Sequence, residues 1–392
     1  MAVRNFLRRQ NYIILILLLL LVGVASYAIY YQRIMTATDN DFSIHILYAQ
    51  DLLAHQPLPS TNLSHPIWQI IISGIFWITR GKINLWIASI LALTISNCLV
   101  SLIIYFWLGH TDGKFGDYAR FFWSLTLPFV APILGLATID NRYYFGYIGL
   151  ANYHNPTILI LRPVALLSFI IVIQVFKKPK NRFWLIAVSA FLTILSALIK
   201  PNYVICIVPA LFLLMIYYKI KNIQIDWRLA IYGIFAPAAI ILPIQLFITY
   251  LSPTSVGYSI IFLPFMAESA FSSYLPIKFL LSIIFPLTVS ILFIRKTFSS
   301  KEFQLGWLSF LIAIFQLYLL AESGKGLLGG NFRWSAQITL FILFIVSARF
   351  IYLQWGSEKV VKAKVMALIS YTPHIISGLI YYIYCFVSIH YS

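Results

Sequence analysis

Long apolar runs, most of them about 20 residues in length, recur along the chain and are separated by short polar segments. A helix of about 20 apolar residues spans the hydrocarbon core of a bilayer. Hydrophobic residues make up 61% of the chain and the mean hydropathy is +0.88. The sequence therefore predicts an all-α polytopic membrane protein with runs at 12–31, 66–79, 85–108, 121–139, 158–176, 183–199, 203–218, 229–251, 276–294, 303–321, 334–353 and 366–389.

The net charge of +17 does not indicate nucleic-acid binding, because the basic residues form short clusters between apolar runs. No segment between the runs is long enough for a soluble domain that presents a binding groove. The three cysteines, Cys98, Cys206 and Cys385, all lie within apolar runs and have no metal-ligand spacing. We therefore expect one integral membrane domain over residues 1–392, with neither a disulfide framework nor a zinc site.

Basic clusters predict which loops face the cytoplasm. Arg4, Arg8 and Arg9 precede the first run, which lacks a small-residue cleavage site and is expected to be a retained signal anchor with a cytoplasmic N-terminus. We expect an integral multi-pass protein, located in the inner (plasma) membrane if the source is bacterial. The other cytoplasmic clusters are expected at Arg80 and Lys82, Lys177–Arg182, Lys219–Arg228, Arg295–Lys301 and Lys359–Lys364.

Strict alternation of the runs conflicts with the charges at one point. It brings residues 140–156 inside, whereas the cluster at Lys177–Arg182 requires them outside, so one of two runs does not cross. Run 66–79 is short, and run 121–139 carries Pro128 and Pro132, which break helices. We expect run 121–139 to be the exception, in a bundle of about 11 to 12 transmembrane helices.

Carboxylates and histidines gather in the predicted outer loop, residues 32–65. Asp41 and His45 are four residues apart and share one face of a helix, whose apolar residues favour an amphipathic helix on the membrane surface. A carboxylate in this position can act as a general base toward an acceptor hydroxyl. The alternative is an interfacial helix with a capping aspartate and solvated neighbours. The Asp39-Asn40-Asp41 spacing also permits a divalent cation, Mg or Mn, although two carboxylates do not define a metal site.

Other polar and charged residues are expected near the same membrane face. Residues 140–157 contain Asn152, His154 and Asn155, which an aromatic belt does not explain, and Arg162 lies about one turn inside the following run. An anionic partner and snorkelling to the membrane surface both account for such an arginine. The remaining candidates for substrate binding are Lys200, before Pro201, and the glycine-rich segment with Glu322, Lys325 and Arg333, which the alternative interpretation treats as a flexible turn.

These segments, in this order, resemble the GT-C superfamily of membrane glycosyltransferases, particularly mannosyltransferase-like members. The resemblance covers about residues 1–215 and consists of Asp41-Phe42 in the first outer loop, His65-Pro66 at the next run, Gly149-Leu-Ala-Asn152 and Lys200-Pro201. Each motif is short, so their order carries more weight than any one of them.

The resemblance implies a GT-C-like bundle that transfers a hexose or pentose from a polyprenyl-phosphate donor to an acceptor hydroxyl on the exoplasmic side. Asp41 would then be the general base, Asp39 an alternate base or metal contact, and His45 and His65 would orient the substrates. The acceptor is a glycan, lipid or protein. A polysaccharide polymerase or ligase, and a transporter or flippase of lipid-linked sugars, remain alternatives.

Overall fold

The structure is a computed structural model of a largely helical chain, with 77% of residues in helices. It describes residues 2–36, 41–109, 114–177, 183–253, 257–354 and 361–388, without the side chains of residues 2–11, 61, 114, 115 and 325. Within these ranges, eight helices are long and apolar enough to cross a membrane, and three shorter apolar helices accompany them. The prediction of an all-α polytopic membrane protein is therefore confirmed at this level.

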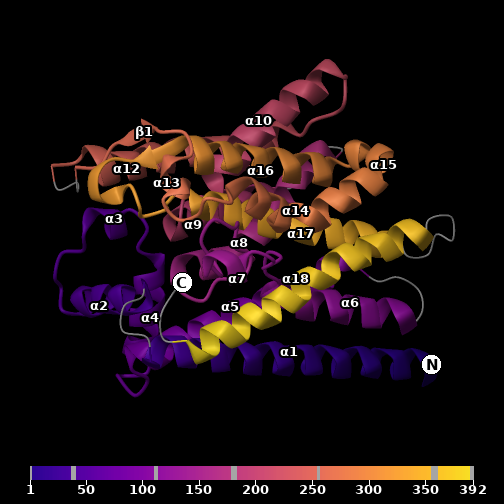
Figure 1. Ribbon diagram of the computed structural model, residues 1–392, viewed down its shortest axis with the longest axis horizontal. Helices are drawn as coiled ribbons and strands as arrows, with labels where there is room; N and C mark the ends of the chain where they lie inside the picture. The colour runs from indigo at the N-terminus through magenta and orange to yellow at the C-terminus, as the bar shows by residue number, and fades with distance from the viewer. Residues whose placement is uncertain are drawn as a thin grey trace.

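The first half of the chain contributes α1, the first-loop helices α2 to α4 near one end of it, and helices that extend to α10 on the far side of the bundle (Figure 1). Its elements are α1 (Ala2–Thr36), α2 (Asp41–Leu53), α3 (Ser60–Leu63), α4 (Ile67–Ile78), α5 (Leu85–Leu108), α6 (Lys114–Thr126), η1 (Leu127–Phe129), α7 (Ala137–Asp140), α8 (Pro156–Val172), η2 (Ile173–Phe176), α9 (Phe183–Ile199) and α10 (Val204–Ile220).

The second half completes the bundle and adds one antiparallel two-stranded ribbon, in which Ile260 pairs with Glu322 and Phe262 with Leu320. Its elements are α11 (Trp227–Ala230), η3 (Ile231–Phe235), α12 (Ala236–Leu246), η4 (Phe247–Leu251), β1 (Ile260–Phe262), α13 (Met266–Ser269), α14 (Leu275–Leu292), α15 (Ile294–Ser299), α16 (Lys301–Leu319), β2 (Leu320–Glu322), η5 (Gly324–Gly326), α17 (Arg333–Leu353) and α18 (Val361–Val387). The segments η3 and η4 are π-helical.

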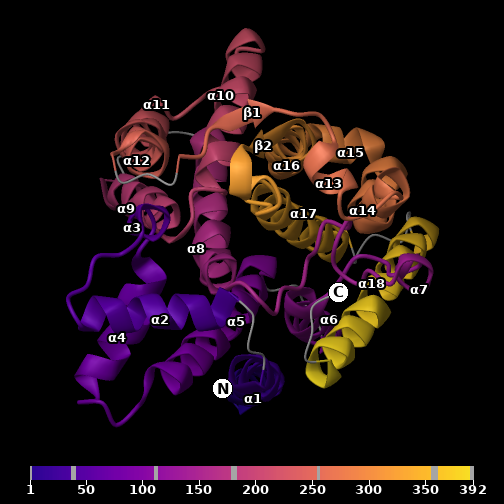
Figure 2. The same ribbon diagram turned by 60° about the vertical axis from the view of Figure 1, so that its left-hand side comes forward.

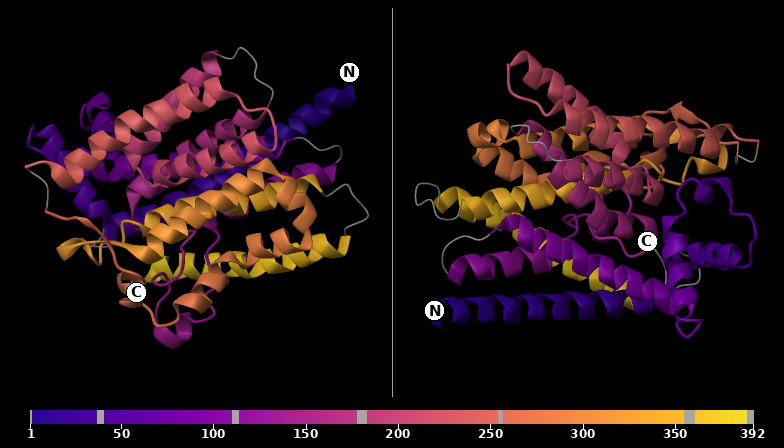
Figure 3. Two further views of the ribbon diagram at one scale, coloured as in Figure 1. Left: turned by 90° about the horizontal axis from the view of Figure 1, so that it is seen from above. Right: turned by 180° about the vertical axis from the view of Figure 1, so that it is seen from behind.

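The long helices lie side by side and run between two ends of the bundle (Figure 3). The N-terminus lies at one end, which we call the N-terminal end, and α2 lies at the other, the Asp41 end. Arg33 donates to the Ser388 carbonyl at 2.8 Å, so α1 and α18 both finish at the Asp41 end. Arg349 donates to the Trp107 carbonyl at 3.0 Å, so α5 and α17 both finish at the N-terminal end.

Helix α17 occupies the centre of the bundle, surrounded by neighbouring helices (Figure 2). Its most apolar window is 83% buried, and α8 follows with 72%, whereas the corresponding window of α1 is only 22% buried. A helix that is apolar all round is suited either to a protein core or to lipid. Here α17 and α8 form the core, and α1 is available to lipid.

Run 66–79 starts and finishes at the Asp41 end. Its helix α4 has 12 residues and is about 18 Å long, shorter than the roughly 30 Å hydrocarbon core. It packs against α2, where Ser73 donates to the Ala49 carbonyl at 3.3 Å. The next helix, α5, runs antiparallel to α1: Asn97 donates to Ser26 and Tyr30 at 3.0 Å, and Tyr105, later in α5, packs with Leu18, earlier in α1. The turn that carries Arg80 and Lys82 therefore lies at the Asp41 end, which corrects the expectation that this cluster faces the opposite side.

Run 121–139, by contrast, advances from one end of the bundle to the other. Helix α6 ends at Thr126, whose hydroxyl meets that of Tyr371 at 2.9 Å, and η1 contains Pro128. Beyond η1 the chain is not helical until α7, and Ala131 N donates to the His374 carbonyl at 3.2 Å. Leu134 N then donates to Ser377 Oγ at 3.1 Å, further along α18. The helix is broken, as expected, but this run is not the one that fails to cross.

The side of the Arg80–Lys82 turn can be tested by cysteine labelling. In a chain whose three native cysteines are replaced by alanine, Lys82→Cys is expected to react with a membrane-impermeant maleimide from the same side as Gln56→Cys. Lys221→Cys, after α10, is expected to react from the other side, and all three native side chains are exposed. Labelling of Lys82→Cys together with Lys221→Cys would place α4 across the membrane and contradict the structure.

Candidate active site

A cavity of about 460 Å³ lies at the Asp41 end. Its walls come from α2, the segment around His65, the starts of α8 and α10, helix α12 with η4, strand β1 and the segment Glu322–Trp334. Five predicted site residues line it: Asp41, His45, His65, Lys200 and Glu322. Ligand pockets typically enclose about 300 to 1,000 Å³, so this cavity has the size of a small-molecule site.

Asp41 is the first residue of α2, which buries Phe42, Ile46 and Ala49. Asn155 Nδ2 donates to Asp41 Oδ2 at 2.7 Å, and among the described residues no other donor reaches this carboxylate. Burial raises the pKa of Asp41, while the hydrogen bond from Asn155 and the charge of Lys200 lower it by less. The result is a carboxylate of increased basicity with one oxygen left for a substrate.

His45 and His65 are neutral members of the cavity wall. Burial, with a smaller contribution from Lys200, lowers the pKa of His45 to about 3, and burial likewise holds that of His65 well below its usual value. Gln69 Nε2 lies 2.9 Å from His45 Nδ1, and Ser64 Oγ lies 2.9 Å from His65 Nδ1. Because an amide nitrogen only donates, His45 Nδ1 accepts and the proton resides on Nε2. Both rings are therefore hydrogen-bonding groups rather than charges.

Lys200 follows the last residue of α9 and brings a buried ammonium group to the cavity. Its Nζ donates to Thr157 Oγ1 at 3.2 Å and lies 5.2 Å from the centre of the Trp334 ring. Burial lowers the pKa of Lys200 to about 8, and the charges of Asp41 and Glu322 oppose that shift. No described carboxylate forms an ion pair with this ammonium, so it remains available to an anionic ligand.

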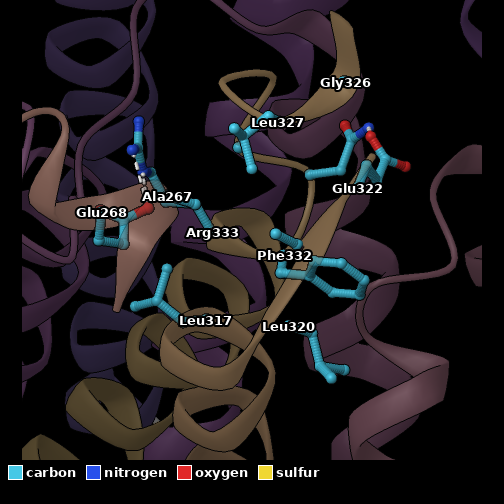
Figure 4. Close-up of a pocket in the computed structure, with 12 residues that line it drawn as sticks. Ala267, Glu268, Leu317, Leu320, Glu322, Gly326, Leu327, Phe332 and Arg333 are labelled. Carbon is cyan, nitrogen blue, oxygen red and sulfur yellow. Dashed lines mark hydrogen bonds and ion pairs between the residues drawn. The ribbon is translucent and has the colours of Figure 1, made fainter. Parts of the chain in front are cut away.

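Glu322 ends β2 and is held by two donors. Tyr250 OH donates to Oε1 at 2.6 Å, and Asn331 Nδ2 donates to Oε2 at 2.7 Å. The residue is 5% exposed and is drawn beside Phe332 in Figure 4. Its carboxylate is therefore fixed in position, in contrast to that of Asp41.

Asn152 and His154 stand behind the cavity wall rather than in it. Asn152 Oδ1 accepts from the backbone nitrogens of His154 and Asn155 at 3.0 and 2.9 Å, which fixes the turn that presents Asn155. The His154 ring lies 5.5 Å from that of Trp334, the residue that also contacts Lys200. These two predicted residues therefore position others, and the structure does not bring them to the cavity.

Arg162 and Arg333 also do not line this cavity. Arg162 donates to the Leu150 carbonyl and lies 4.8 Å from the Phe341 ring. Arg333 Nη2 lies 2.8 Å from Glu268 Oε1 (Figure 4). Its guanidinium also lies 4.9 and 4.8 Å from the ring centres of Phe145 and Phe271. Both cations have partners within the protein. The local sequence did not predict these contacts, because several of the partners are distant in the chain.

Two further predicted residues fall outside what the structure describes. Asp39 lies in the segment 37–40, and Lys325 has a described backbone but no described side chain. The described residues contain no group of three or more histidine, cysteine or acidic side chains that would hold a metal. A metal site that includes Asp39 therefore stays a prediction.

Several cavity residues and their partners were not among the predicted site residues, although Asn155 stood out as one that an aromatic belt does not explain. Asn155 precedes Pro156 and caps α8 by accepting from Ile158 N at 3.1 Å, a signal that predicts a helix start but not a bond to Asp41. Gln69 and Tyr250 lie within apolar runs. No local pattern distinguishes them from ordinary membrane-helix residues, because their partners are distant in sequence.

Comparisons with known proteins found no match: no family model, curated protein or solved structure is similar to this chain.

The buried ion pair between Arg333 and Glu268 is expected to stabilise this end of the bundle. Both side chains are 5% exposed, so Glu268→Gln leaves a buried cation unpaired, and such losses cost about 3 to 5 kcal/mol. Glu302→Gln is a matched control, because the Glu302–Arg349 pair is more exposed and such pairs contribute only about 0 to 1 kcal/mol. Thermal unfolding in detergent measures both, and equal transition temperatures for the two variants would contradict this assignment.

Proposed function

We propose that the protein is a glycosyltransferase that moves a monosaccharide from a polyprenyl-phosphate donor to an acceptor hydroxyl at the Asp41 end. The observation that carries the proposal is the cavity in which Asp41, with raised pKa, and the unpaired ammonium of Lys200 occur together. Glycosyl transfer needs a base for the acceptor and a cation for the departing phosphate, and these two groups supply them.

The proposed mechanism is a single displacement. The acceptor oxygen forms a bond to the anomeric carbon while Asp41 takes the hydroxyl proton through the carboxylate oxygen that Asn155 does not hold. The bond from the anomeric carbon to the phosphate oxygen breaks, and its electron pair leaves with the phosphate, whose charge Lys200 stabilises. The anomeric configuration inverts.

The other cavity residues suit a sugar. Amide side chains of Asn62, Asn202 and Gln245 line the cavity, and neutral His45 and His65 add hydrogen-bonding groups of either polarity. Aromatic rings of the same cavity offer faces for sugar C–H groups. A fully apolar ligand would leave these hydrogen-bonding groups without partners, which is unfavourable.

We expect the phosphate to carry a lipid chain, because several apolar side chains that line the cavity are exposed. Ile44, Leu246 and Ile260 line the cavity and are nevertheless 48%, 47% and 44% exposed. They come from α2, α12 and β1, and α12 belongs to a candidate membrane span that is only 28% buried. A polyprenyl tail that lies in the bilayer can therefore remain in lipid while its phosphate reaches Lys200.

We further propose that the chain makes eleven passes: ten through helices and one through the broken segment from α6 to α7. The N-terminus is then cytoplasmic and the Asp41 end exoplasmic, in accordance with the basic clusters at 177–182, 219–228, 295–301 and 359–364. The acceptor is a glycan, lipid or protein that reaches the exoplasmic face.

Removal of the proposed base tests the function directly. Asp41→Asn keeps the size of the side chain and an acceptor for Asn155, but it cannot take a proton. We expect transfer from a radiolabelled polyprenyl-phosphate sugar in proteoliposomes to fall by roughly 10² to 10⁴-fold. Asp51→Asn, a change on the same helix outside the cavity lining, is the control. Unchanged transfer by Asp41→Asn would remove Asp41 from the base role, and flipping of the lipid without glycosidic-bond formation would indicate a transporter.

The pH dependence of transfer tests the role of Lys200. Its pKa of about 8 means that the ammonium form is present below that pH and is lost above it, so the rate is expected to decline above about pH 8. In Lys200→Arg the cation persists, because a guanidinium keeps its proton, and the decline is expected to shift to higher pH. A basic limb that is identical in the two proteins would exclude Lys200 as its source.

A further inference from the structure

Glu322 is a buried carboxylate of the cavity whose hydrogen-bond donors are neutral. Tyr250 and Asn331 each donate to one of its oxygens, and none of the described arginine or lysine side chains forms an ion pair with it. The nearby Arg333 is committed to Glu268. A buried carboxylate without a cation is costly, and protein interiors normally provide one.

The balance of charge in the cavity points in the same direction. Among the described residues that line it, two carboxylates, Asp41 and Glu322, face one ammonium, Lys200, while His45 and His65 are neutral. In the proposed reaction Lys200 is engaged by the phosphate of the donor. Among the described side chains, Glu322 then has no cation to pair with, and the ligand is left to match its negative charge.

The surroundings of Glu322 favour an organic cation. Tyr250, Tyr258 and Phe332 line the same cavity, and aromatic rings attract cations through their faces. The loop is also shaped to hold the carboxylate there: a Cβ at Gly326 would lie 2.9 Å from Glu322 Cβ and 3.1 Å from the Tyr258 ring. Such distances leave no room for a side chain at Gly326.

We propose that the sugar in this cavity is an amino sugar, whose ammonium group binds to Glu322. This inference rests on the proposed glycosyl transfer and names its substrate class. Glu322 selects the sugar by charge and takes no part in bond making, since both of its oxygens are held and Asp41 serves as the base. A neutral sugar of the same shape leaves Glu322 without a counter-charge and binds more weakly.

Binding of soluble monosaccharides tests the proposal without any transfer reaction. The purified protein in nanodiscs is titrated, by ligand-detected NMR, with sugars in which one hydroxyl at a time is replaced by an amine, each paired with its parent sugar. At a pH where the amine is protonated, at least one amino sugar is expected to bind roughly tenfold or more tightly than its parent, as charge-assisted hydrogen bonds allow. Equal affinities for every pair would overturn the proposal.

Three variants assign the effect to the carboxylate. Glu322→Gln is expected to abolish the preference, and Gly326→Ala to reduce it by displacing Glu322 without changing the charge. Glu302→Gln is the matched control, because Glu302 pairs with Arg349 at the N-terminal end, away from the cavity, and this variant should retain the preference. A preference that survives Glu322→Gln, or one that EDTA removes, would overturn the proposal, the latter because a metal would then be the cation.

The experiments distinguish a failure of the amino-sugar proposal from a failure of the glycosyltransferase proposal. Asp41→Asn is expected to lose transfer and keep the amine preference. If transfer is absent from the wild-type protein while the preference persists, the glycosyltransferase proposal is wrong and the amine site stands. If transfer occurs and no amino sugar is preferred over its parent, the amino-sugar proposal is wrong and the glycosyltransferase proposal stands.

Discussion

The hydrogen bond between Asn155 and Asp41 joins two parts of the chain on which the cavity depends. It connects the first residue of α2, which lies outside the long helices of the bundle, with the cap of α8, one of its two most buried helices. The same asparagine satisfies Ile158 N at the start of α8, so one side chain fixes both the helix and the carboxylate. Lys200 approaches from α9 and is tied to Thr157 in the same first turn.

Removal of water gives these groups their properties. Burial raises the pKa of Asp41 and lowers that of Lys200, so the base becomes stronger and the cation becomes titratable near pH 8. Both shifts have the same cause, and each group partly offsets the shift of the other. A site of this kind is possible only where a bundle end encloses the polar side chains, here with η4, β1 and the Glu322–Trp334 segment.

The sequence predicted the class of fold and the convergence of Asp41, His45, His65, Lys200 and Glu322, because charges in an apolar chain are rare and occur where runs end. It also predicted the break in run 121–139, from Pro128 and Pro132, because proline interrupts a helix locally. It failed on the crossing of runs 66–79 and 121–139, since the non-helical segment 130–136 crosses by hydrogen bonding to α18, a helix about 240 residues away in the chain. The partners of Arg333 and Arg162 are likewise set by tertiary contacts that no local pattern records.

Asp41 is the proposed general base, and the acidic limb of the pH–rate profile tests this role most directly. In Asn155→Ser, the serine still caps α8 but is too short to reach Asp41. In the native protein the hydrogen bond from Asn155 lowers the pKa of Asp41, and the variant lacks this bond. The pKa of Asp41 in the variant is therefore higher, and the acidic limb of the transfer rate is predicted to move to higher pH. An acidic limb at the same pH in both proteins would contradict the assignment of Asp41 as the base.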